Sequence, residues 1–122
     1  MEKRIIQKSS ADIVLIYSDT VIIDTAQAAL DFLASVYYND NCTRIAINKE
    51  AFCDDFLVLS TGVAGEILQK VINYKMKLAI IGEFSLYTSK ALKDFIYECN
   101  NGKDVFFVGD TETAIEKLEK AR

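Results

Sequence analysis

The chain has 122 residues, 51% of them apolar, so we expect a single domain over residues 1–122 that buries its core without metals or cross-links. Its formal charge is −4 at pH 7, with Lys and Arg scattered among Asp and Glu, which excludes a basic stripe for nucleic acid. The absence of histidine excludes Ser-His and Cys-His nucleophile pairs and removes the commonest transition-metal ligand.

An opening β-hairpin is expected at the start of the chain. Residues 4–7 and 13–17 are short runs rich in β-branched side chains, which favour strands. The connecting stretch KSSAD suits a turn, because Ser9 and Ser10 can bond their own backbone. The two runs are therefore predicted to pair with each other.

A helix is expected after the hairpin. Residues 21–23 are a third short β-rich run that leads directly into Asp24. Asp24 with Gln27 three residues later resembles a capping box, and the helix is expected to end near Tyr38. Its apolar stripe at helical spacing is Ala26, Ala29, Leu30, Leu33 and Val36.

Three strands and three helices are expected to alternate through the rest of the chain. The apolar runs RIAIN (44–48), KLAII (77–81) and VFFV (105–108) predict strands, each followed by a loop and a helical pattern. This order predicts an α/β fold with a mixed, mainly parallel sheet and helices packed on it. Ligands and partners tend to meet such sheets at the carboxyl ends of the strands.

Apolar spacing and capping residues define these last three helices. The inward stripe of the first of them is Ala64, Ile67, Leu68, Val71 and Ile72. Ser89 is expected to cap the next helix, and Gly102 to end it as a left-handed C-terminal cap. Asp110 or Thr111 is expected to open the last helix.

The cysteines and the apolar runs indicate a cytoplasmic protein. Cys42, Cys53 and Cys99 are odd in number and form no CxxC pair, so neither a disulfide framework nor a zinc site is indicated. The start lacks a signal-peptide core, and no apolar run approaches the roughly 20 residues of a membrane span. We therefore expect no membrane insertion, no metal and no cofactor.

The stretch LSTGVAGEILQK, residues 59–70, places two hydroxyl side chains before a helix. Ser60 or Thr61 can satisfy an unpaired backbone N–H there, so capping is the simplest role of these residues. The same helix end would also stabilise a phosphate, either bound as a ligand or attached to Thr61 or Ser60. The spacing of Gly62 and Gly65 fits no nucleotide motif, and both glycines can let another backbone come close.

The stretch GEFSLYTSK follows the strand KLAII and would lie beside the first loop. Phe84, Leu86 and Tyr87 are a large apolar area for a loop, which is typical of a partner surface. The alternative is that two of the three cover the core. Glu83 and Lys90 could hold a polar ligand or form a solvated ion pair.

The order of elements resembles a STAS domain, the module of anti-sigma factor antagonists and of the cytoplasmic ends of sulfate transporters. VLIYSDTVIIDTAQAALDFL is similar to the family's second strand, turn and first helix, and RIAIN to the strand before its switch loop. LSTGVAGEIL falls where the family has Asp-Ser-Ser-Gly, and KLAIIG and VFFVGDTETAIEKL match later elements. More closely, TGVAGEILQK, KLAIIGEFS and YTSKALKDFIYECNNG resemble the bacterial and archaeal domain of unknown function 4180.

The STAS resemblance implies a regulatory module rather than an enzyme. In the antagonists, a partner kinase phosphorylates the hydroxyl residue before the glycine, which breaks the docking of that helix on the kinase. The resemblance places this role on Thr61, with Ser60 beside it. Leu59 stands where the family has its aspartate, and the preceding loop is longer by a few residues.

These observations predict a non-enzymatic STAS-like module that binds a protein partner through residues 60–66 and 83–87. The alternative is a site for a nucleotide, phosphate or lipid at the same edge, with weak catalysis by Glu66 or Glu83. Homodimerisation through a sheet edge or a helix face is a third alternative. The residues expected at the contact surface are Gly62, Gly65, Glu66, Glu83, Phe84 and Tyr87.

Overall fold

The computed structural model describes residues 1–8 and 11–121 of the chain, and within them five strands form one sheet in the order β1-β2-β3-β4-β5. The strands β1 and β2 pair antiparallel, and the remaining neighbours are all parallel. The predicted mixed α/β sheet with its opening hairpin is confirmed, while the expected turn at Ser9 and Ser10 lies outside the described residues. The strands are β1 (Glu2–Gln7), β2 (Asp12–Tyr17), β3 (Arg44–Asn48), β4 (Lys77–Ile81) and β5 (Val105–Val108).

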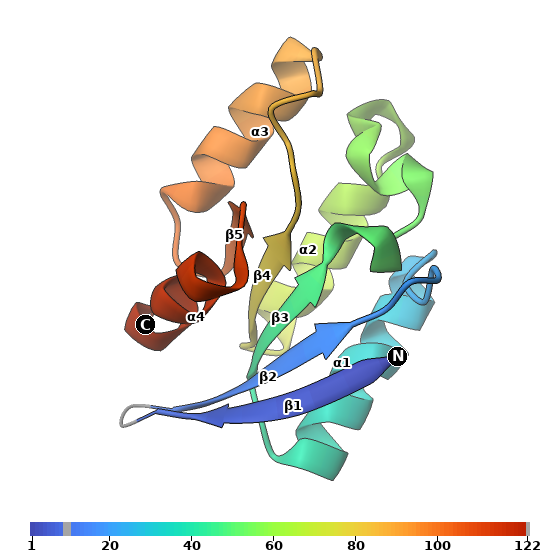
Figure 1. Ribbon diagram of the computed structural model, residues 1–122. Helices are drawn as coiled ribbons and strands as arrows, with labels where there is room; N and C mark the ends of the chain where they lie inside the picture. The colour runs from blue at the N-terminus through green and yellow to red at the C-terminus, as the bar shows by residue number, and fades with distance from the viewer. Residues whose placement is uncertain (9–10, 122) are drawn as a thin grey trace.

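The helices cover both faces of the sheet (Figure 1). One face carries α1 (Ala26–Asp40), α2 (Val63–Asn73) and α3 (Lys90–Asn100), whose apolar side chains join one core cluster. The opposite face carries α4 (Thr111–Lys120), which packs on a second and smaller cluster. Among the described residues, no helix is both long enough and apolar enough to cross a membrane.

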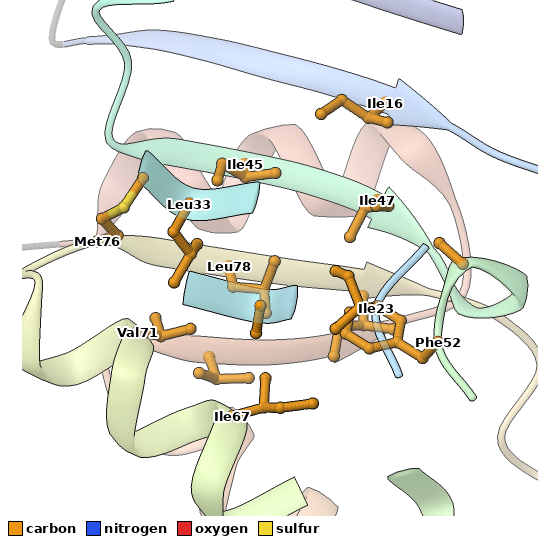
Figure 2. Close-up of a cluster of buried hydrophobic side chains, with 14 of the residues drawn as sticks. Ile16, Ile23, Leu33, Ile45, Ile47, Phe52, Ile67, Val71, Met76 and Leu78 are labelled. Carbon is orange, nitrogen blue, oxygen red and sulfur yellow. The ribbon is translucent and has the colours of Figure 1, made fainter. Parts of the chain in front are cut away.

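The central strands send their large side chains to one face and their small ones to the other. Ile45 and Ile47 of β3 join the core cluster under α1 and α2, and Figure 2 shows both beside Leu78 of β4. Ala46 and Ala79 alternate with them and face α4. Small side chains there let α4 approach the sheet closely, while each buried isoleucine or leucine contributes about 1.5–3 kcal/mol.

The start of α1 differs from the expectation. Thr25 rather than Asp24 is the N-cap, because its Oγ1 accepts the N–H of Ala28 at 3.0 Å. The helix also continues to Asp40, two residues beyond the predicted end, and closes on a left-handed Asn41. Residues 21–23 form no strand, since only Ile23 makes an isolated bridge to Phe52.

Two further expectations for the helices are wrong and two are confirmed. Ile72 is exposed, because α2 packs with a narrower stripe of Ala64, Ile67 and Val71. Gly102 is not left-handed; its N–H donates to the carbonyl of Cys99 in an ordinary turn. Ser89 caps α3 and Asp110 caps α4, as the sequence predicts. Each side chain accepts the backbone N–H three residues later.

Candidate functional site

A cleft of about 770 Å³ opens at the carboxyl ends of β3 and β4. It lies between the segment that follows β3 and the segment that joins β4 to α3, which both extend beyond the strand ends in Figure 1. Its lining is mainly apolar, with a few polar and charged side chains. The lining residues are Val21, Lys49, Glu50, Phe52, Cys53, Asp54, Leu57, Val58, Leu59, Ser60, Tyr87, Thr88, Ser89, Ala91 and Leu92.

The first wall of the cleft is a chain of three short 3-10 helices where the sequence predicts a loop. These are η1 (Lys49–Ala51), η2 (Asp54–Leu57) and η3 (Leu59–Thr61). The backbone of residues 22–23 anchors them, because both N–H groups donate to the carbonyl of Ala51, at 2.8 and 2.9 Å. Phe56 is buried and packs on Phe52 with ring centroids 4.5 Å apart. The wall is therefore attached to the core on its inner side.

Thr61 braces this wall and is not the N-cap of α2. Its hydroxyl oxygen lies 2.8 Å from the carbonyl oxygen of Val58 and 2.9 Å from that of Asp55, and its single proton is shared between these two acceptors. The N-cap is Gly62, which has a φ of 80° and makes no side-chain capping bond. Because Gly62 turns the chain, the Thr61 side chain bonds to the turns that precede it. On the side of α2, its hydroxyl oxygen accepts the N–H of Val63 at 3.3 Å.

The second wall is the segment between β4 and α3. Phe84 is half-buried, and its ring meets that of Phe107 edge-to-face with centroids 5.3 Å apart. Tyr87 is also half-buried, and its ring centroid lies 6.4 Å from that of Phe84. Leu86 instead points outward and is 79% exposed. Of the three apolar side chains, only Phe84 packs on the core cluster, while Tyr87 lines the cleft.

Glu83 and Lys90 make separate local contacts and do not pair with each other. The carboxylate of Glu83 accepts the N–H and the hydroxyl of Ser85, and these hydrogen bonds lower the pKa of Glu83. Lys90 forms an ion pair with Asp94 one turn later on α3, with 2.8 Å between Nζ and Oδ2. Neither side chain lines the main cleft.

Lys49 connects the two walls. Its Nζ lies 3.6 Å from Glu50 Oε2 and 5.8 Å from the centroid of the Tyr87 ring. Its aliphatic stem crosses Gly82, where an added Cβ would lie 2.8 Å from Lys49 Cβ. Burial lowers the pKa of Lys49, but contacts with Tyr87 and Glu50 outweigh burial and raise it overall. Lys49 is therefore a fixed cation at neutral pH.

A buried polar pair positions Glu50 beside Lys49. Asn48 ends β3 and forms a reciprocal pair with the backbone of Ser18, accepting its N–H at 2.8 Å and donating to its carbonyl at 2.6 Å. The same Nδ2 donates to Glu50 Oε1 at 3.1 Å, and this hydrogen bond is the main cause of a lowered pKa of Glu50. Asn48 thus ties the ends of β2 and β3 together and orients a carboxylate at the cleft.

The structure separates the sequence-predicted site residues into two groups. Ser60 and Tyr87 line the main cleft, and Glu83 joins Tyr87 in an adjoining hollow of about 230 Å³. The exposed Gly62, Gly65 and Glu66 line neither cavity. No described atom lies within 4 Å of a Cβ built on either glycine, so no backbone comes close there. Phe84 supports the second wall from behind.

Sequence reasoning did not find several residues of the cleft, chiefly Lys49, Glu50 and Leu57. One signal was available, because a polar Asn48 at the end of the buried run RIAIN needs a buried partner. Among the described residues, no group of three or more His, Cys, Asp or Glu side chains could hold a metal ion. The cleft therefore offers apolar surface, one cation and carboxylates.

The chain is similar in fold to two solved structures over nearly its whole length. One is the anti-sigma factor antagonist SpoIIAA in its unphosphorylated form, with 12% identity, a TM-score of 0.48 and coverage of 98% of this chain and 99% of that chain. The other is a Thermotoga maritima protein provisionally assigned as an anti-sigma factor antagonist, with 13% identity, a TM-score of 0.47 and coverage of 97% and 95%.

No curated protein matches the chain. The profile of the family described as "Domain of unknown function (DUF4180)" matches residues 8–118, which include the three stretches that carry the predicted resemblance. Since this match spans most of the sequence, the chain belongs to the DUF4180 family.

Proposed function

We propose that the chain is a cytoplasmic, non-enzymatic interaction module whose protein partner docks on the cleft. The observation that carries this proposal is an exposed apolar rim. Val21 and Val58 line the cleft and are 52% and 49% exposed, and Leu86 in the adjoining hollow is 79% exposed. Apolar side chains at a rim remain in water around a small molecule, whereas a protein surface covers them.

The lining indicates what such a partner would present. An apolar anchor side chain fits against Leu57 and Leu92 on the cleft walls. Lys49 and Glu50 lie at the boundary of the cleft and the adjoining hollow, where they can meet polar groups of the partner. Charged residues at an interface rim set orientation more than affinity, so the apolar rim is expected to dominate binding.

The proposal is tested with charged substitutions at the rim. Leu86→Asp and Val58→Asp are prepared as baits for quantitative affinity capture from the native cells, and the recovered partner is then titrated against each purified variant. We expect about a tenfold or greater loss of affinity for both variants, because burying a new carboxylate is unfavourable. Tyr97→Asp is the control, since Tyr97 lies exposed on α3 and outside the cleft.

A partner that binds all three variants as tightly as the unmodified chain would contradict docking at the cleft. Loss of binding in Tyr97→Asp alone would move the interface to α3. Thermal melting of each variant by circular dichroism shows that the exposed substitutions leave the fold intact. The assay therefore separates the location of binding from the stability of the fold.

Phosphorylation of Thr61, with Ser60 as the neighbouring acceptor, is a subordinate part of this proposal. The supporting observation is that the Thr61 hydroxyl donates to the carbonyls of Asp55 and Val58. A phosphate ester has no hydroxyl proton to donate, and its charge of about −1.5 to −2 would stand beside the backbone of the acidic residue Asp55. Modification would thus loosen the first wall of the cleft and weaken partner binding.

Mass spectrometry tests this switch directly. Protein isolated from its native cells under several stress conditions is expected to carry phosphate on Thr61 or Ser60 in at least one condition. Thr61→Val, which has the same shape but no hydroxyl, is expected to bind the partner more weakly, whereas Ser60→Ala keeps the brace. Consistent absence of phosphate at both positions would end the phosphorylation hypothesis and leave the docking proposal standing.

A small ligand in the same cleft is the second candidate. The volume of about 770 Å³ falls within the range of small-molecule sites, and Lys49 supplies a cation at its edge. A thermal-shift series with ATP, inorganic phosphate and a fatty acid tests this candidate. A melting temperature that rises with ligand concentration supports a ligand site. No shift with any of the three favours the protein partner.

A further inference from the structure

A further surface hollow lies between the carboxyl-terminal ends of α1 and α2. These helix ends lie at the opposite end of the sheet from the carboxyl ends of β3 and β4 (Figure 1). It has a volume of about 210 Å³. We call it the tyrosine pocket, and it is lined by Leu33, Ala34, Tyr37, Tyr38, Tyr74 and Met76. Leu33 and Met76 belong to the buried core in Figure 2, so core residues form the floor of the tyrosine pocket.

Three tyrosines leave much of their surface in water around this floor. Tyr37, Tyr38 and Tyr74 are 49%, 80% and 56% exposed. The rings of Tyr37 and Tyr38 meet edge-to-face, with centroids 5.3 Å apart and planes at 88°. This geometry is a favoured aromatic arrangement, so the two rings hold each other in place. Clustered, exposed and pre-positioned tyrosines are typical of protein interfaces.

The tyrosine pocket combines a highly exposed aromatic side chain with a hollow. Tyr38 is the most exposed of the three rings and stands directly beside the hollow. An apolar cavity of about 150 Å³ accommodates benzene, so the hollow has room for one aromatic ring. A two-fold symmetric interface needs such a self-complementary patch, because the same surface must supply both the protrusion and the recess.

The distribution of charge favours the tyrosine pocket over the other hollows as the contact between two copies of the chain. None of the described residues that line the tyrosine pocket is charged. The cleft, in contrast, contains Lys49, Glu50 and Asp54, and a hollow between the ends of α3 and α4 contains three lysines and a glutamate. Two copies with a charge of −4 each repel one another, and an uncharged patch is where they can meet with least repulsion.

The sheet edges are less suited to self-association. The outer strand β1 carries Glu2, Lys3 and Arg4 in succession, and charged side chains on an edge strand oppose pairing with another chain. At the other edge, the side-chain amide of Asn100 occupies both backbone groups of Phe107. The tyrosine pocket is therefore better suited to self-association than either edge of the sheet.

We propose that the tyrosine pocket is the interface of a homodimer, in which Tyr38 of each copy enters the hollow of the other across a two-fold axis. Each ring then packs against the Leu33 and Met76 floor and between Tyr37 and Tyr74 of the second copy. The two clefts stay open at the far ends of the dimer, so it can present two copies of the cleft to partners.

Analytical ultracentrifugation of the full chain tests the dimer from about 1 µM to about 1 mM, a range that brackets weak and moderate dissociation constants. We expect a monomer–dimer equilibrium whose dissociation constant falls modestly as salt is added, because salt screens the repulsion between two copies of charge −4. Tyr38→Asp is expected to raise that constant about 30-fold, the effect of removing an interface hot spot. Ala34→Leu, which fills the hollow and keeps Tyr38, is expected to weaken the dimer as well.

Tyr97→Asp serves as the matched control, since Tyr97 is a tyrosine on α3 that is 70% exposed, against 80% for Tyr38. It is expected to dimerise like the unmodified chain. A chain that stays monomeric throughout the concentration range would overturn the proposal. So would a dimer that persists in both Tyr38→Asp and Ala34→Leu but dissociates in Ile5→Lys, because that result would place the interface on the β1 edge.

Discussion

Gly82 lies where the backbone after β4 passes closest to the side chain of Lys49. A Cβ at this position would stand 2.8 Å from Lys49 Cβ and 3.1 Å from Lys49 Cδ. The contact involves the base of the lysine side chain, so neither residue can move aside without moving η1. Gly82 is thus the glycine whose missing side chain shapes the cleft, and it joins the two walls at their base.

Gly82→Ala is therefore expected to destabilise the fold by about 1–3 kcal/mol, the usual cost of forcing an extra carbon into a packed position. Urea unfolding followed by circular dichroism measures the change. Gly65→Ala is the matched control: it lies in α2 with open space around it and is expected to raise stability by up to about 1 kcal/mol. Equal stability of Gly82→Ala and the unmodified chain would show that Lys49 is not held against Gly82.

Among the elements, the last three strands of the chain could be predicted from the sequence with the bounds that the structure has. β3, β4 and β5 are continuous apolar runs, because helices cover both of their faces. Residues 21–23 have the same β-rich composition but pair at Ile23 alone, with Phe52. That partner is distant in sequence, so local composition could not show how far the pairing extends.

The start of α1 and the first wall of the cleft also could not be predicted from the local sequence. Asp24 and Thr25 are both good capping residues, and only the direction of the entering chain decides that Thr25 bonds the N–H of Ala28. The 3-10 helices after β3 depend on hydrogen bonds from Ile22 and Ile23 to the carbonyl of Ala51. Such long-range anchors leave no periodic pattern in the sequence.

The β5 edge is closed by one side chain of α3. Asn100 Nδ2 donates to the carbonyl of Phe107 at 3.1 Å, and its Oδ1 accepts the N–H of Phe107 at 2.7 Å. Asn100→Ala is expected to cost about 2 kcal/mol, since it leaves two backbone groups of a buried residue without these partners. It is also expected to promote aggregation by exposing the strand edge. Urea unfolding and light scattering measure the two effects.

Asn101→Ala is the control for the β5 edge, because Asn101 is the exposed next residue and its side chain does not hold β5. It is expected to leave stability and solubility nearly unchanged. If Asn100→Ala and Asn101→Ala behave alike, the amide of Asn100 does not protect the edge. The Asn100→Asp variant adds a further check, because it keeps the acceptor and loses the donor to the Phe107 carbonyl.

The start of α4 should make stability depend on pH. Asp110 accepts the N–H of Thr113 at 2.7 Å, and this hydrogen bond lowers the pKa of Asp110. A carboxyl group whose pKa is lower in the folded state stabilises the fold above its unfolded pKa, about 3.9, and this stabilisation is lost as pH falls through the folded pKa. Asp110→Asn keeps a capping oxygen that does not titrate.

The melting temperatures of the unmodified chain and of Asp110→Asn, measured from about pH 6 to about pH 2, test this expectation. The unmodified chain is expected to lose more stability on acidification, so that the difference between the two proteins shifts in favour of the asparagine variant at low pH. Parallel pH profiles of the two proteins would show that the cap does not depend on the charge of Asp110.

At the scale of the whole molecule, topology predicts where a site lies better than which residues form it. The sequence predicts the carboxyl edge of the sheet as the place to examine, and the cleft is found there. Gly62, Gly65 and Glu66 lie outside the cleft, because the left-handed Gly62 and the direction of α2 carry them away from it. Tyr38 and Tyr74 are far apart in sequence, so only the packing of α1 on α2 brings them together.

The cleft and the tyrosine pocket lie at opposite ends of the sheet and share no lining residue. Effects of substitutions at separated sites usually add, so dimerisation and partner binding are expected to be independent. Leu86→Asp should weaken partner binding without changing the dimer dissociation constant, and Tyr38→Asp should do the reverse. Titration calorimetry with the captured partner and ultracentrifugation measure the two constants for both single variants and for the double variant. A dimer constant that shifts when the partner is saturating would instead show that the sheet couples the two surfaces.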